Sequence, residues 1–115
     1  MSLKLLQVED LFQLEQIGRY FGGAYSFSPD GTTLAYVVQR AKANTKNHKQ
    51  DFLFDNDRAD IWLVDWATSE PVNLTKGIAE DVGYWSPAWS PDGKWLAMLS
   101  TKGDNLTLWV CSKAT

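Results

Sequence analysis

Two stretches of the chain share one pattern of apolar and polar positions. Each begins with an aromatic residue, continues as Ser-Pro-Asp-Gly, and then has two variable positions before a run of apolar residues; the copies occupy 27–37 and 89–99. Proline presets the backbone for the second turn position, aspartate accepts local amide hydrogen bonds, and glycine tolerates left-handed geometry. The pattern therefore predicts two β-hairpins, whose tight turns are formed by Ser28, Pro29, Asp30 and Gly31, and by Ser90, Pro91, Asp92 and Gly93.

The apolar runs that follow the turns predict strands with both faces covered. Residues 34–38 (Leu-Ala-Tyr-Val-Val) and 95–99 (Trp-Leu-Ala-Met-Leu) are apolar at successive positions, not at alternate ones. Such a strand has no polar face for water. Among antiparallel repeat architectures, the β-propeller covers both faces by packing radial four-stranded blades on each other. We therefore expect an all-β fold of antiparallel, propeller-like blades.

Further strand patterns follow each hairpin in the same order. Residues 59–66 are dense in β-forming residues and lead through a polar turn to 71–75, and 106–110 repeats the style of 61–64. Pro29 and Pro91 lie 62 positions apart, and the first unit carries 15 extra residues between its proline and its later tryptophan. Without them the period is 47, close to the ~40–50 residues of one four-stranded propeller unit.

This repeat divides the chain into three segments. We expect a short N-terminal helix and lead-in at 1–22, a first blade at 23–77 with a polar insertion at 40–58, and a second, incomplete blade at 78–115. The helix is predicted from Leu11, Leu14 and Ile17, which have helical spacing within 3–17. It would pack as a lid on a sheet edge or bind a partner. About two blades cannot close a ring of about four to eight.

The insertion is read as a solvated surface connection. Its first part, 40–50, is basic, and the acids Asp51, Asp55, Asp57 and Asp60 follow, so the two charge runs are expected to compensate each other in part. The stretch Asp55-Asn56-Asp57 could attract a hard cation. It lacks the glycine and the closing glutamate of a calcium loop, so we expect no metal site there.

Catalytic chemistry is poorly provided for in this sequence. The chain has no Gly-x-Ser-x-Gly pentapeptide, and its single histidine, His48, lies in the polar insertion, where a solvent-exposed role is expected. Serines beside the aspartates of the two turns have no imidazole to take their proton, so they are turn residues. No phosphate-binding glycine loop and no zinc-spaced Cys/His set occurs. We expect no catalytic residue and no cofactor.

Aromatic residues and the cysteine are assigned to packing. Six tryptophans could form a surface that stacks sugars or bases, and Trp66, Trp85 and Trp95 leave that alternative open. Cys111 stands in a strand pattern and cannot form an internal disulfide. Aromatic residues at equivalent repeat positions, or beside a turn, are expected to be structural; these are Phe27, Trp62, Trp89 and Trp109.

Net charge and hydropathy argue against nucleic acid and membrane as partners. The net charge is -3 with acids and bases interspersed, so there is no electrostatic case for a nucleic-acid partner. No stretch approaches eighteen consecutive apolar residues, so no membrane span is expected. The opening residues do not read as a secretory signal, which leads us to expect a cytoplasmic protein.

The repeats also resemble a known family. The paired Ser-Pro-Asp-Gly hairpins, together with 61–65 and 73–77, resemble the propeller repeats of the prolyl oligopeptidase family and of TolB-type proteins. The opening 8–14 resembles more narrowly the start of acylaminoacyl-peptidase-like members. The resemblance implies a parent serine peptidase with an N-terminal propeller that limits substrate access by size and a C-terminal α/β-hydrolase domain. This sequence ends at Thr115, so no catalytic residue is carried over.

Two functions are therefore expected, from different classes. The first is a non-catalytic propeller portion of a serine peptidase, with a structural and gating role, whose partners are the α/β-hydrolase domain and passing peptide substrates. The second is a free-standing propeller-repeat interaction module that associates with itself. Either way, two blades leave strand edges and faces uncovered, so we expect a homo-oligomer.

Overall fold

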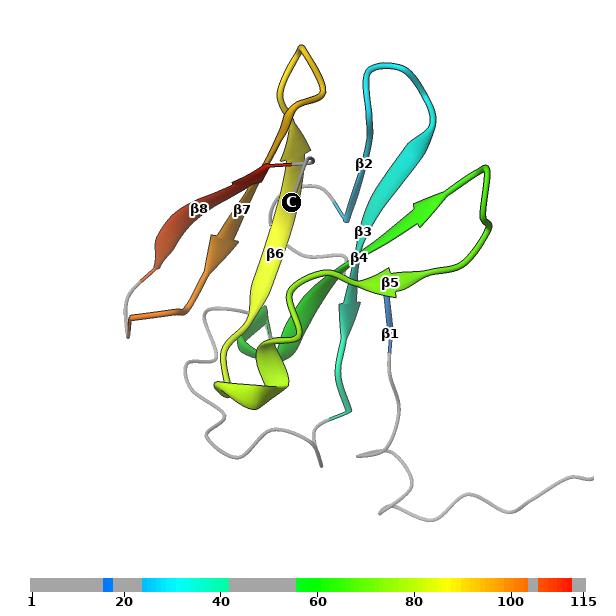
Figure 1. Ribbon diagram of the computed structural model, residues 1–115. Helices are drawn as coiled ribbons and strands as arrows, with labels where there is room; N and C mark the ends of the chain where they lie inside the picture. The colour runs from blue at the N-terminus through cyan, green and yellow to red at the C-terminus, as the bar shows by residue number, and fades with distance from the viewer. Residues whose placement is uncertain (1–15, 18–23, 42–55, 104–105, 113–115) are drawn as a thin grey trace, which may run out of the picture.

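The computed structural model describes residues 16–17, 24–41, 56–103 and 106–112 of the chain. These residues form two antiparallel β-sheets, joined by one link and packed on each other (Figure 1). Two 3-10 helices, η4 (Asn56–Arg58) and η5 (Gly77–Ala79), are the helical elements of the described part. The prediction of an all-β, blade-like fold is confirmed, and the described sheets do not close into a ring.

The first sheet is a meander of four strands with a short fifth strand at its edge. The strands β2 (Tyr25–Phe27), β3 (Thr33–Gln39), β4 (Ala59–Asp65) and β5 (Val72–Asn73) each pair with the next. Strand β1 (Gln16–Ile17) pairs with the far end of β3. Four consecutive antiparallel strands are the arrangement of one propeller blade.

The second sheet has three strands in sequence order. They are β6 (Tyr84–Trp89), β7 (Trp95–Ser100) and β8 (Thr107–Ser112). Within the described residues β8 pairs only with β7, so its other edge is open. The β2–β3 and β6–β7 turns point to the same end of the molecule (Figure 1), as they would in two neighbouring blades of one repeat.

Strand register establishes which residues are equivalent in the two sheets. Tyr36 lies opposite Trp62, and Met98 lies opposite Trp109. Because Tyr36 and Met98 occupy the same place after their turns, Trp62 and Trp109 are equivalent, as the sequence spacing predicts. The 15 extra residues of the first unit therefore fall between β3 and β4. Most of that insertion, His48 included, lies outside the described residues.

The core lies between the sheets and uses one face of each. Ala35 and Ile61 of the first sheet are fully buried, and they cluster with Leu96, Met98 and Trp85 of the second sheet. We call the first-sheet side of this contact, formed by the inward residues of β3 and β4, the core face. The expectation that both faces of each strand are covered is wrong for the described chain, because each sheet has only one neighbour.

A bulge adapts β6 to its place against the first sheet. Trp85 pairs with Leu99 and Ala88 with Ala97, so Ser86 and Pro87 together oppose a single residue of β7. Ser86 has a φ of 53°. A bulge is a position where a strand accepts proline, which has no amide hydrogen for the ladder. Strand β6 then lies against β2, β3 and β4.

A buried ion pair joins the segments around this core. Arg40 donates from Nη1 to Asp60 Oδ2 (2.8 Å) and from Nη2 to the carbonyl of Val82 (2.9 Å). Asp60 Oδ1 accepts from the Thr75 hydroxyl (2.6 Å) and the Gly77 amide (2.7 Å). The network ties the end of β3, the start of β4, and the link between β5 and β6 together. It is one position where the predicted compensation of the two charge runs is confirmed.

Gly77 lets the link come this close. A Cβ on Gly77 would lie 2.3 Å from the Val82 carbonyl oxygen and 3.2 Å from Asp60 Oδ1. The carbonyl is backbone and cannot swing away, so a side chain at this position would push the link off the ion pair.

Two sequence expectations are wrong in this region. Arg40 and Asn56 belong to the stretch read as a solvated connection, yet they are 7% and 2% exposed. The burial is possible because both side chains have polar partners, Asp60 for Arg40 and Gln39 for Asn56. The predicted helix does not reach Ile17, since Gln16–Ile17 is a strand that completes backbone pairing along β3. The rest of that helix lies outside the described residues.

Removing one member of the ion pair tests this network. Asp60→Ala leaves the Arg40 guanidinium buried without its carboxylate, and we expect the free energy of unfolding to fall by about 3–5 kcal/mol. Glu80→Ala is the matched control, because its contact with Lys102 (3.6 Å) is exposed, and should cost less than about 1 kcal/mol. Urea denaturation measures both. Equal losses for the two variants would contradict the network's role.

Candidate binding surface

The two Ser-Pro-Asp-Gly turns have the same geometry. In each, the serine hydroxyl donates to the aspartate carboxylate at 2.6 Å and accepts the amide of a later residue at 3.0 Å. Gly31 and Gly93 both have a φ of 73°, a conformation that glycine adopts without strain. The structure thus places Ser28, Pro29, Asp30 and Gly31, and Ser90, Pro91, Asp92 and Gly93, in two matching turns, where each serine proton is engaged by its own turn.

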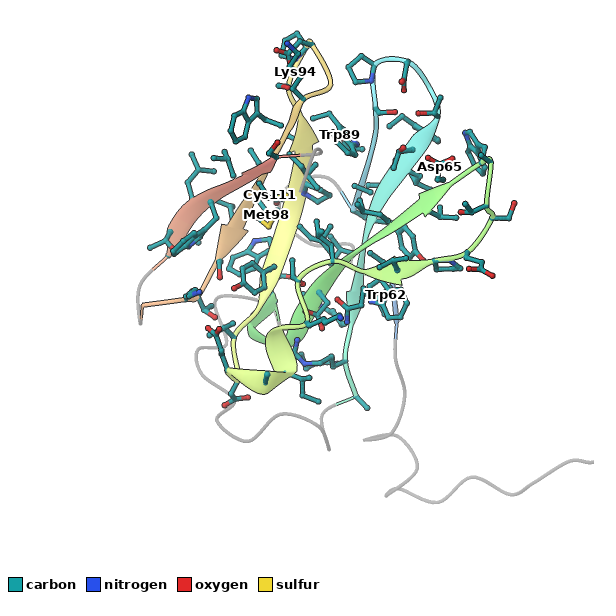
Figure 2. All side chains as sticks on the ribbon, viewed as in Figure 1. Trp62, Asp65, Trp89, Lys94, Met98 and Cys111 are labelled. Carbon is teal, nitrogen blue, oxygen red and sulfur yellow. The ribbon has the colours of Figure 1, made fainter. Side chains whose placement is uncertain are left out.

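Local hydrogen bonds stabilise the charged form of the Asp92 carboxylate in the second turn. The Ser90 hydroxyl and, after it, the Lys94 amide (2.9 Å) donate hydrogen bonds to Asp92 and hold the pKa of its carboxyl below the ordinary value. The turn lies at the tip of its hairpin, with Lys94 beside it (Figure 2). A carboxylate stabilised in its charged form is a poor proton acceptor, so its chemistry is that of a turn cap.

The described residues hold no cluster of metal-binding side chains. No group of three or more His, Cys, Asp or Glu side chains in that part of the chain could hold a metal ion. His48 and Asp55 lie outside it, and the Asn56 amide oxygen accepts a hydrogen bond from Gln39 (3.4 Å). None of the helices there is long and apolar enough to cross a membrane.

An apolar groove lies on the face of the first sheet that turns away from the core. Its volume is about 580 Å³. Tyr25 and Phe27 are 62% and 51% exposed, and their rings meet edge to face with centroids 5.9 Å apart. We call this surface the groove face; it is lined by Ala24, Tyr25, Phe27, Leu34, Tyr36, Val64 and Pro71.

Register explains why these side chains gather. Leu34 lies opposite both Phe27 and Val64, and Tyr36 lies opposite Tyr25. Residues directly opposite each other in antiparallel strands project on the same face, and alternate residues of one strand do too. Partial burial among these neighbours raises the pKa of Tyr36. No lining residue carries a charge, so the groove can be covered without desolvating an ion.

A second apolar surface lies on the outer side of the second sheet. Trp95, Leu108 and Val110 are 48%, 70% and 58% exposed. Leu108 lies opposite Leu99 and Val110 lies opposite Ala97, which places them on one face of β7 and β8. We call it the β7–β8 face. It is also formed by uncharged residues.

The predicted structural aromatics differ in their surroundings. Trp89 is half-buried between the two hairpins and donates from Nε1 to the Ser26 carbonyl (3.1 Å; Figure 2). Phe27 holds the equivalent place in the first sheet, yet it is exposed, because neither of the two described sheets covers the groove face. Trp62 is half-buried. Trp109 is 42% exposed, and the Lys102 ammonium nitrogen lies 5.1 Å from the centroid of its ring.

Trp66 and Cys111 also have structural roles in the described part of the chain. Trp66, left open by the sequence, donates from Nε1 to the Gly31 carbonyl at 2.6 Å and so braces the first turn from the end of β4. No sequence signal pointed to that contact. Cys111 is partly buried against the core, and burial raises the pKa of its thiol, which fits a packing role.

Comparison with known proteins finds solved structures of similar fold. No protein-family model and no curated protein matches the chain. Among solved structures, putative TolB from Agrobacterium tumefaciens matches with a TM-score of 0.55 and 23% identity over 76% of this chain and 25% of that one. TolB from Acinetobacter baumannii matches with a TM-score of 0.52 and 22% identity over 81% of this chain and 19% of that one.

The fold is that of part of a TolB-type propeller. The chain spans about a quarter or less of the length of these structures. At this level of identity the similarity concerns the fold alone. The predicted resemblance to TolB-type repeats is confirmed, and the narrower resemblance to peptidases stays a prediction.

The second turn can be tested at its glycine. Gly93→Val forces a β-branched side chain into a positive φ and should lower the free energy of unfolding by about 1–3 kcal/mol. Gly93→Asn should cost much less, since asparagine adopts this conformation readily, and the nearest atom to a Cβ here is Pro29 Cδ at an ordinary 3.5 Å. Urea denaturation measures both. Equal effects of valine and asparagine would show that the backbone angle is not the cause.

Proposed function

We propose that this chain is a non-catalytic propeller module that binds protein through the open faces of its two blades. The observation that carries the proposal is the groove face, a hollow of about 580 Å³ lined by uncharged, mostly apolar side chains. The β7–β8 face adds a second surface of the same character on the other sheet.

Physical chemistry supports a protein partner for such surfaces. Large exposed contiguous apolar patches mark interaction sites, and tyrosine, phenylalanine and tryptophan are enriched in the buried cores of protein interfaces. A partner that covers Tyr25 and Phe27 buries two large exposed rings that already contact each other edge to face. The open edge of β8 offers main-chain hydrogen bonds to a neighbouring strand as well.

Photo-crosslinking tests this function directly. A benzoylphenylalanine placed at Tyr25 should form adducts with protein in the cells that express the chain, because the groove face is covered there. The matched control is the same residue placed at Ile78, which is 50% exposed but lies in η5 away from both faces. Adducts from position 25 and none from position 78 support the function. Absence of adducts from position 25, or equal adducts from both, would contradict it.

We infer a second candidate, the gate of a serine peptidase, from the sequence alone. Its support is the resemblance of 8–14 and 61–65 to acylaminoacyl-peptidase-like chains. The blades would then be one part of a larger propeller that limits substrate access by size, docked on an α/β-hydrolase domain. An open blade face is also what a portion of a larger ring would present.

Labelling with a serine-directed fluorophosphonate separates the two candidates. An antibody raised to residues 56–103 should detect, in the source cells, a labelled band far heavier than 13.0 kDa if the chain is part of a peptidase. If the antibody detects a band that takes no label, whether at 13.0 kDa or heavier, while a known serine hydrolase in the same lysate is labelled, the gating role is contradicted.

A further inference from the structure

We propose that the groove face of one copy of this chain is filled by the β7–β8 face of a second copy, in a head-to-tail arrangement. The inference rests on the proposed function and names the partner. It follows from the internal interface between the two sheets, where the repeat-equivalents of these two faces pack on each other.

The groove face has a buried counterpart in the second sheet. By register, Leu34 is equivalent to Leu96 and Tyr36 to Met98. Leu96 and Met98 are 1% and 4% exposed, because they pack on the core face of the first sheet. The groove face is therefore the same blade surface as the one that the second sheet buries, but no sheet within the described part of the chain packs on it.

The β7–β8 face has its counterpart in the first sheet. Leu108 is equivalent to Ile61, and Val110 is equivalent to Leu63. Ile61 is fully buried, and Leu63 packs against the same cluster. The exposed face of the second sheet is thus the surface that, in the first sheet, forms one half of the core.

The chain therefore carries two copies of each half of one interface. One pair of halves is in contact between the two sheets, and the other pair is exposed. Inside the molecule, the core face of the first sheet contacts the second sheet. The two remaining open surfaces are the equivalents of these same two partners. Repeating the internal contact between molecules places the β7–β8 face of one copy over the groove face of the next, and this contact is heterologous.

Side-chain chemistry agrees with that pairing. The lining of the groove is uncharged, and so are the outward residues of β7 and β8, so neither surface loses the hydration of an ion on contact. Trp95 stands where Thr33 stands in the first sheet, and its larger side chain supplies volume for the hollow. A heterologous contact that closes gives a ring. Rings of about four to eight blades require two to four copies of a two-blade chain.

Complementation between two variants tests the arrangement. Phe27→Arg places a charge in the groove face, and Val110→Arg places one in the β7–β8 face; both positions are more than half exposed, so the fold should tolerate the change. Light scattering coupled to gel filtration measures the mass. The wild-type chain should run as an assembly of about two to four copies, and each variant alone as a monomer. Mixed together, the variants should form a dimer, because the intact β7–β8 face of the Phe27→Arg variant can still fill the intact groove face of the Val110→Arg variant.

Ile78→Arg is the control and should keep the wild-type mass, since Ile78 lies outside both faces. Circular dichroism shows whether each variant is folded. If Phe27→Arg does not fold, Tyr25→Arg replaces it, and if Val110→Arg does not fold, Leu108→Arg replaces it. A monomeric wild-type chain, variants that keep its mass, or a mixture that stays monomeric would each overturn the head-to-tail contact. Crosslinks from position 25 to a different protein would then retain the proposed function while this partner assignment fails.

Discussion

The structure depends on the contact between one face of the first sheet and one face of the second. Neither hairpin unit could bury enough apolar surface alone, because a single sheet leaves both of its faces wet. Ala35 and Ile61 reach full burial only where Leu96 and Met98 lie across from them. The repeat in the sequence is therefore a repeat of mutually dependent parts, as in other architectures built from stacked units. The open faces follow from the same arrangement, since among the described residues each sheet has one neighbouring sheet, which covers only one of its two faces.

The buried ion pair fixes how the two sheets are joined. Arg40 and Asp60 lie where the polar insertion enters and leaves the first sheet, and their hydrogen bonds reach Val82, just before β6. A buried ion pair is tolerated only where further hydrogen bonds complete its shell. Here Thr75 and the Gly77 amide complete it on the aspartate side. The polar residues thus hold the connection between β5 and β6 in one conformation, while the contact between the apolar faces buries the hydrophobic side chains.

Much of the fold could be predicted from the sequence, because the turn chemistry and the repeat spacing are local signals. The positive φ of Gly31 and Gly93, and the pairing of β2 with β3 and of β6 with β7, were readable from the Ser-Pro-Asp-Gly turns and the runs after them. Burial was less readable. Phe27 and Trp89 look alike in the sequence, and only the presence or absence of a neighbouring sheet separates them. The burial of the Arg40 ion pair was hidden for a similar reason. The charge pattern predicts that the basic and acidic runs compensate each other, but gives no sign that Arg40 meets Asp60 inside the fold. The open faces, on which the proposed function rests, become visible only once the neighbours of each sheet are known.

The most direct measurement of the central claim is a nuclear Overhauser spectrum of the chain. Contacts inside each hairpin, such as Tyr36 with Trp62 and Met98 with Trp109, would appear for any pair of independent sheets. Stacking of the sheets predicts additional cross-peaks, from the Trp89 indole hydrogen to Ser26 and from the Met98 methyl to the side chains of the core face. Hairpin cross-peaks without those between the sheets would contradict the account.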